Sequence, residues 1–167
     1  MSTSFKILSP TAILGYGYPI ESFQNGIRKH PDLIAVDAGS TDPGPFYLGS
    51  GKPFTNRAGV KRDLLHILKH SVSKKIPVII GTAGGSGAKP HVDWCIDIIK
   101  EICKDLAISL SLGIIYSDIP KELVKKSIKS KLVKPLPFAP EIAAKDIDHI
   151  TNIVAQMGIE PIQNAVN

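Results

Sequence analysis

Residues capable of chemistry gather in two short stretches, DAGSTDPGP over 37–45 and GTAGGSGAKPH over 81–91. Four of the first seven residues in the second stretch are glycine. One residue at positive φ usually suffices to connect a strand to a helix, so this density exceeds what a connection requires. We therefore expect another group to approach this backbone closely. A ligand is the functional interpretation, and a tight turn is the alternative.

The 81–91 stretch matches neither common phosphate-binding pattern. GxxxxGK[ST] fails because no lysine follows a glycine at the required spacing, and GxGxxG is broken after Gly87. Glycine amides and the positive end of a helix that begins near Pro90 could nevertheless face an anion. The ligand-binding residues expected here are Thr82, Gly84, Gly85, Ser86, Gly87 and Lys89.

His91 and Asp93 lie in the first turn of the helix predicted after this loop. A helix start favours neutral imidazole, so His91 is a candidate general base or electrophile. The alternative is a surface histidine without a role. Asp93 is typical of a carboxylate that compensates the helix dipole.

The stretch at 37–45 offers two carboxylates. Asp37 ends a buried strand and precedes a glycine turn, a position from which carboxylates in α/β enzymes often hold a metal, a hydroxyl or a catalytic partner. Asp42 follows five residues later, so the pair could divide acid and base roles, with Gly39 and Ser40 contacting the ligand. The alternative is that both aspartates only form turns.

Other patterns predict no metal site and little serine chemistry. His66 and His70 have the spacing of a zinc helix but lack the HExxH glutamate, and they lie opposite the apolar stripe. Cys95 and Cys103, about 12 Å apart along one helix, are expected to be buried thiols. No GxSxG occurs around Ser40 or Ser86. The cofactor is left open.

Apolar runs and helical periodicity alternate along the chain. Strands are expected at 5–15, 32–40, 77–81 and 108–116, a long loop at 41–56, a short helix within 17–32, and helices at 59–74, 91–106, 119–132 and 143–158. The strands lack a polar face, which predicts an α/β fold with a mostly parallel sheet and helices on both faces, Rossmann-like and doubly wound or half-barrel-like. Such sheets bind ligands at the carboxyl ends of their strands.

Composition indicates one α/β domain over 1–167. The net charge of +5 comes mostly from residues 118–137, which hold six lysines and two acidic residues. Lysines without arginines or interleaved aromatics predict a solvated surface, so we expect no nucleic-acid partner. No apolar run reaches about 18 residues, which favours a soluble cytoplasmic protein with no membrane partner.

AVDAGSTDPGPFYLGSG at 35–51, GTAGGSGAKPHVDW at 81–94 and AQMGIEPIQNAV at 155–166 resemble the acyclic-terpene-utilisation family. The resemblance covers essentially the whole chain, which looks like the N-terminal portion of the markedly longer family members. It implies a cytoplasmic catabolic enzyme, or an accessory protein, that handles branched acyl or carboxylate intermediates such as coenzyme A thioesters. It implies no catalytic residues.

These observations favour a small-molecule enzyme, or its ligand-binding part, that holds an anionic acyl, carboxylate or phosphate-bearing substrate. Asp37 and His91 would transfer protons, as in a lyase or hydratase. The alternative is a noncatalytic binding or scaffold module whose site is completed by another chain or by a homo-oligomer. A basic-surface nucleic-acid-binding protein ranks third.

Overall fold

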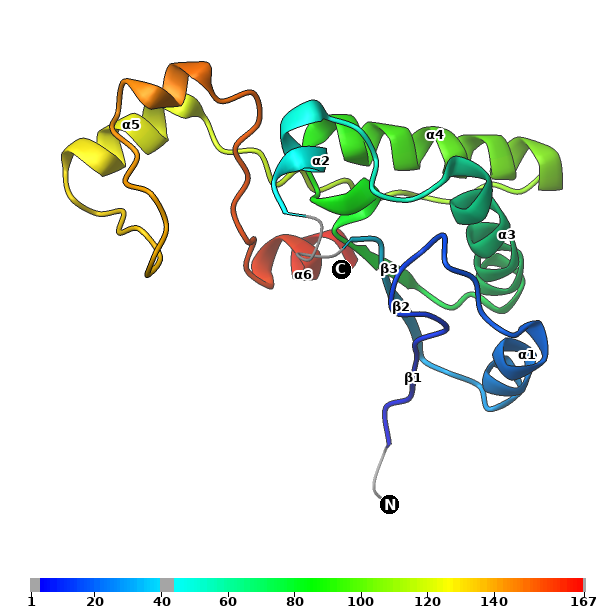
Figure 1. The fold of residues 1–167 in the computed structure, drawn as a ribbon. Helices are drawn as coiled ribbons and strands as arrows, with labels where there is room; N and C mark the ends of the chain where they lie inside the picture. Colours follow the sequence, from blue (N-terminus) through cyan, green and yellow to red (C-terminus); the bar gives the residue numbers. More distant parts are fainter. Residues whose placement is uncertain (1–3, 40–43, 167) are drawn as a thin grey trace.

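The computed structural model describes residues 4–39 and 44–166, which form an α/β fold around a small parallel sheet (Figure 1). The strands β1 (Ile7–Leu8), β2 (Leu33–Asp37) and β3 (Val78–Gly81) lie in the order β1-β2-β3. All pairs are parallel, with Leu8 opposite Ile34 and Asp37 opposite Gly81. The predicted α/β class, with a mostly parallel sheet flanked by helices, is confirmed.

Six α-helices lie within the described residues: α1 (Ile20–Arg28), α2 (Phe46–Ser50), α3 (Arg57–Lys74), α4 (Lys89–Leu106), α5 (Lys121–Lys129) and α6 (Glu160–Val166). Two 3-10 turns, η1 (Ala83–Gly85) and η2 (Asp146–His149), accompany them. Figure 1 shows α1 and α3 on one side of the sheet and α6 on the other. The strands follow one another in chain order, as they do in half of a barrel.

The hydrophobic core joins β2 to one face of α3 and one face of α4. Asn56 begins α3 by accepting hydrogen bonds from the amides of Ala58 and Gly59, which is an ordinary N-cap. Apolar residues recur at helical spacing on both helices and are buried against the sheet: Ile34, Val36, Val60, Leu64, Ile67, Cys95, Ile98, Ile99 and Ile102. Cys95 and Cys103 are free thiols, and burial raises the pKa of Cys95 to about 11.

Two strand predictions need correction. The run at 5–15 contributes a strand of only two residues, β1, because the chain then turns toward α3. The run at 108–116 forms no strand. Ile108 and Leu110 pack against the core and Gly113 lies against Ala165 of α6, whereas Leu112 and Ile114 stay exposed, so only part of this apolar run is packed and none of it pairs with β3.

The helix predicted at 143–158 is also wrong. Only η2 is helical there, because the following segment is drawn into an antiparallel bridge between Asp118 and Val154. The amide of Ile119 donates to Ile153 at 2.9 Å. The loop predicted at 41–56 contains the short helix α2, and α6 was not predicted.

The chain divides into a part with a core and a part without one. The clustered buried apolar residues all precede position 107. Of the described residues that follow, Ile147 is the buried one, and many large apolar side chains are exposed. Within the described part of the chain, no helix is both long enough and apolar enough to cross a membrane.

This division predicts different effects of two leucine substitutions. Leu64 is 0% exposed and Leu132 is 78% exposed. Leu64→Ala should lower the free energy of unfolding by about 2–5 kcal/mol because it leaves a cavity in the core. Leu132→Ala should change it by less than about 0.5 kcal/mol. Urea denaturation of both variants measures the difference, and equal losses would contradict the division.

Candidate functional site

The two chemistry-bearing stretches meet at the carboxyl ends of β2 and β3. Oδ1 of Asp37 accepts hydrogen bonds from the amides of Ala38 at 2.7 Å and Gly39 at 3.0 Å. It also accepts a hydrogen bond from the Thr82 hydroxyl, across the gap between the two loops. Asp37 therefore orders its own turn and ties that turn to the glycine loop.

The glycines of the loop allow close packing with the protein itself. A Cβ on Gly39 would overlap the carbonyl of Gly85, and one on Gly84 would overlap the backbone of His91. Gly84 also has φ of +73°, which L-residues rarely adopt. The close approach predicted for this loop is thus present, and the approaching groups belong to neighbouring segments of the chain.

The C-terminal end of the glycine loop contacts Ser117, which directly follows the 108–116 run for which a strand was predicted. The carbonyl of Gly87 accepts a hydrogen bond from the Ser117 amide at 2.9 Å, and a Cβ on Gly87 would lie 2.7 Å from the Ser117 hydroxyl. Gly85 donates its amide back to Thr82 at 2.7 Å within η1. The glycine loop is consequently in contact with Gly39, His91 and Ser117.

His91 lies inside the protein, with 0% of its surface exposed. Its Nε2 lies 2.9 Å from the Lys52 carbonyl, which can only accept, so Nε2 carries the proton. Nδ1 then accepts from the Ser86 hydroxyl at 2.7 Å. Burial is the largest influence on the pKa of His91 and lowers it below its ordinary value, while the hydrogen bond to the Lys52 carbonyl opposes this. The lowered pKa favours the neutral imidazole, and both ring nitrogens form hydrogen bonds with protein groups.

The first turn of α4 already holds acceptors from the protein. Asp118 accepts from the Lys89 amide at 2.7 Å, and the Ser86 hydroxyl accepts from the Ala88 amide at 3.3 Å. The Asp118 carboxylate therefore lies at the start of α4, where an anionic ligand was predicted.

The Lys89 side chain points to a second small cluster. Its ammonium lies 2.6 Å from Asp93 and 4.9 Å from the ring centroid of Tyr116. Tyr116 donates its hydroxyl to Asp93 at 2.8 Å. The hydrogen bond to Lys89 lowers the pKa of Asp93, and the same bond raises the pKa of Lys89. Asp93 therefore does more than compensate the helix dipole.

A groove opens beside Asp37, on the sheet face where Ala35 and Ile79 are only partly buried. It has a volume of about 440 Å³ and is lined by Ser9, Thr11, Ala12, Ala35, Val36, Asp37, Ile79 and Gly81. These residues come from the carboxyl ends of all three strands or follow them directly. The floor is mainly apolar, and Asp37 is the ionisable residue among those that line it.

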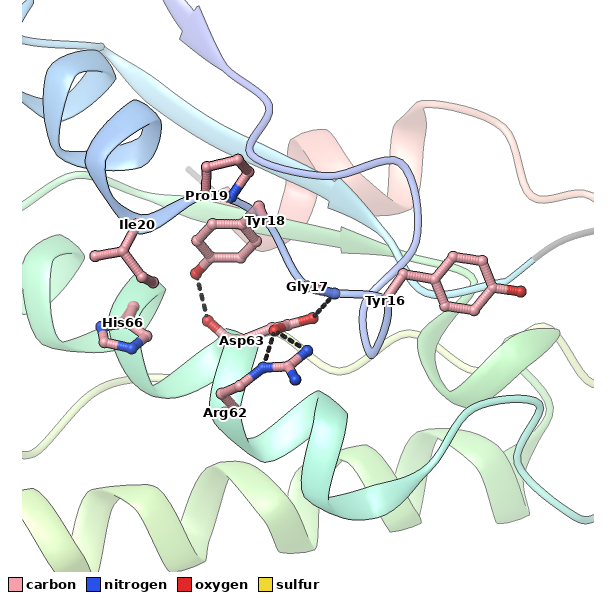
Figure 2. Close-up of a pocket in the computed structure, with 8 residues that line it drawn as sticks. All are labelled: Tyr16, Gly17, Tyr18, Pro19, Ile20, Arg62, Asp63 and His66. Atoms are coloured by element: carbon pink, nitrogen blue, oxygen red, sulfur yellow. Dashed lines mark hydrogen bonds and ion pairs between the residues drawn. The ribbon is translucent and has the colours of Figure 1, made fainter.

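A second cavity, of about 530 Å³, lies between the 16–20 loop and α3 (Figure 2). Asp63, which is only 2% exposed, is one of the residues that line this cavity. Its Oδ2 accepts hydrogen bonds from the amides of Gly15 at 2.8 Å and Gly17 at 3.0 Å. Arg62 donates to the other carboxylate oxygen at 2.9 Å. Tyr18 donates its hydroxyl to the Asp63 carbonyl at 2.7 Å, and burial raises the Tyr18 pKa strongly.

Sequence reasoning missed Asp63, although a signal for it exists. Asp63 lies three residues after Val60 and four before Ile67, so helical periodicity places it on the buried stripe of α3. A buried carboxylate requires donors, and the nearby GYGY segment at 15–18 provides amides. Asp63 serves as the anchor of that loop.

The structure thus brings Asp37, Gly39, Thr82 and Gly85 together, and it places Ser86 and His91 in one buried pair. Asp42 and Ser40, which were predicted as a catalytic and a ligand-binding residue, lie outside the described residues. Within the described ranges, no group of three or more metal-ligating side chains could hold an ion.

Comparison with family models, with curated proteins and with solved structures finds no match to this chain. The resemblance to the acyclic-terpene-utilisation family consequently stays a prediction.

The buried His91 predicts a pH dependence of stability. Its pKa is lower in the folded chain than in the unfolded chain, so the unfolded state binds more protons at mildly acidic pH. The free energy of unfolding should therefore fall as pH drops from about 7 to about 5. His91→Gln can keep both hydrogen bonds and should show a shallower fall, measured by urea denaturation at several pH values. Exposed His149→Gln is the control, and a wild-type slope in His91→Gln would contradict the assignment.

Proposed function

We propose that the chain is a small-molecule enzyme, or the ligand-binding part of one, and that it takes an acyl or carboxylate compound in the groove beside Asp37. The observation that supports this best is the combination of an apolar floor and one ionisable carboxylate at the carboxyl ends of the strands. Parallel sheets commonly bind their ligands at this edge.

The groove suits a ligand with an apolar body. Ala12, Ala35 and Ile79 provide apolar surface for an acyl chain, and the hydroxyls of Ser9 and Thr11 provide polar contacts. The proposed ligand carries an anionic end, for which these hydroxyls are the candidate partners. A coenzyme A thioester or a free carboxylate has this chemistry.

Asp37 is the residue to which we assign proton transfer, as in a lyase or hydratase. Its carboxylate lines the groove, and three donors from the protein hold it in place. A fixed carboxylate next to an apolar surface can remove a proton adjacent to a carbonyl group. His91 acts in this proposal as a positioning residue, because it holds Ser86 and the 52–54 segment against the glycine loop.

Ligand binding should raise the thermal stability of the chain. A ligand at about 100 times its dissociation constant stabilises by about 2.7 kcal/mol, which corresponds to roughly 5–10 °C for a chain of this size. Phosphate, short and branched carboxylates, coenzyme A esters, nucleotides and divalent metal ions form the panel for differential scanning fluorimetry. We expect carboxylates or thioesters to give the largest shift.

Gly81→Ala tests whether the groove is the binding site. A Cβ on Gly81 meets Asp37 only at 3.7 Å, an ordinary contact, so the variant should fold and narrow the groove. The ligand-induced shift should shrink in Gly81→Ala and persist in Gly49→Ala, where a Cβ meets nothing within 4 Å. Equal shifts in both variants would place the ligand elsewhere.

Asp37→Asn separates an enzyme from a noncatalytic binding module. Asparagine keeps the acceptor oxygen for the 38–39 amides and for Thr82, but it removes the base. Solvent deuterium exchange into the bound compound, followed by NMR, should slow by about 10²- to 10⁴-fold while the thermal shift remains. A wild-type chain that binds its ligand without exchanging any proton would support the noncatalytic module.

That second candidate, a module completed by another chain, has its own support. Residues 107–166 contribute one buried side chain among those described, and large apolar residues there face solvent. Soluble proteins rarely leave so much apolar surface uncovered unless it meets a partner. Sedimentation analysis of the purified chain distinguishes two ways of covering this apolar surface. In a homo-oligomer, a second copy of the chain would cover it, whereas a monomer would require a different protein chain.

A further inference from the structure

The segment between α5 and η2 carries apolar residues that nothing in the described chain covers. We name residues 131–142, KLVKPLPFAPEI, the apolar loop. Figure 1 shows it projecting away from the sheet and from the α3–α4 layer. It has neither helix nor strand, and a turn at its tip is closed by the Ala139 amide, which donates to Leu136 at 3.0 Å.

Among the described residues, the most exposed large apolar side chains lie in this loop. Leu132 and Leu136 are 78% and 77% exposed, and Phe138, at the turn, is fully exposed. Phe138 has φ of +65°, a left-handed backbone conformation that is uncommon for residues other than glycine. Scattered exposed leucines are normal in soluble proteins, but a cluster at the tip of a projecting loop requires a binding partner.

Lysines lie near the apolar tip in the sequence. Between Glu122 and Asp146 the chain has six lysines and one acidic residue, Glu141. Lys125 is paired with Glu122 and Asp148. The four others nearest the tip form no ion pair with the described residues, and they are Lys126, Lys129, Lys131 and Lys134. The apolar tip is thus preceded in the sequence by four exposed lysines.

We propose that the apolar loop inserts Phe138 and Leu136 into the surface of an anionic lipid bilayer, while the flanking lysines contact the lipid headgroups. An apolar tip gains free energy by leaving water, and lysines near an anionic surface add electrostatic attraction. No membrane partner was expected because the sequence has no apolar run of about 18 residues. A loop that binds at the bilayer surface needs no such run.

Two features favour a bilayer over a groove on another protein. The apolar side chains lie on an irregular loop instead of one face of a helix or strand, so they present no regular ridge for a groove to recognise. The cations are all lysines, which act as point charges and suit mobile headgroups better than fixed bidentate partners. A fluid bilayer surface can accommodate apolar side chains without a fixed shape or a regular spacing.

Co-sedimentation with lipid vesicles tests the proposal. The intact chain should bind vesicles containing about one-third phosphatidylserine at least about tenfold more tightly than vesicles of phosphatidylcholine alone. Raising the salt from about 0.1 M to about 0.5 M should weaken that binding, because screening shortens the reach of the lysine charges. In Phe138→Trp, fluorescence at position 138 should shift to shorter wavelength with anionic vesicles, after subtraction of the Trp94 signal.

Matched variants separate insertion from simple adsorption. The double variant Leu136→Ser with Phe138→Ser should bind anionic vesicles at least about tenfold more weakly, because the insertion energy is lost. Phe46→Ser, on an exposed phenylalanine of α2, should bind like the wild type. Lys131→Gln with Lys134→Gln should weaken binding, and Lys69→Gln with Lys74→Gln should do so less.

Three results would overturn the proposal. The first is a wild-type chain that does not bind anionic vesicles, which would leave the loop as a contact for another protein. The second is undiminished binding by the double serine variant, which would show adsorption by charge without insertion. The third is an equal loss in Phe46→Ser. The loop side chains are exposed, so the thermal midpoint of each variant should match that of the wild type.

Discussion

The close approach of the 37–39 turn to the glycine loop is the constraint on which the rest of the structure depends. It requires glycine at Gly39 and Gly84, because a side chain at either position would overlap backbone. The hydrogen bond from Thr82 to Asp37 then joins the ends of β2 and β3. This junction determines where α4 begins, and α4 in turn provides much of the core. Local chain geometry at one sheet edge thereby sets the packing of the largest helices.

The same junction also explains the conformation of the glycine loop. Its conformation serves contacts with the 52–54 and 116–118 segments, and Asp118 already accepts from the start of α4. The available space lies instead in the groove on the neighbouring sheet face. Asp37 belongs to both places, since it orders the loops and lines the groove. Structural and chemical roles thus converge on one carboxylate, a frequent arrangement at the ends of parallel strands.

The two parts of the chain suit different tasks. The described residues before position 107 contain the clustered buried apolar side chains, which provide the rigid base that a small-molecule site requires. The later residues expose many large apolar side chains and include the six lysines of the 118–137 segment.

The sequence by itself determined the α/β class, the helices α3 and α4, and the position of Asp37 at a strand end. These features depend on local periodicity and turn chemistry, which neighbouring residues encode. Only the tertiary structure decided that 108–116 is not a strand and that 143–158 is not a helix, because each segment makes contacts with distant residues, Gly113 with Ala165 and Val154 with Asp118. It also decided that His91 and Asp63 are buried, since burial depends on which segments pack over a residue and not on its sequence neighbours.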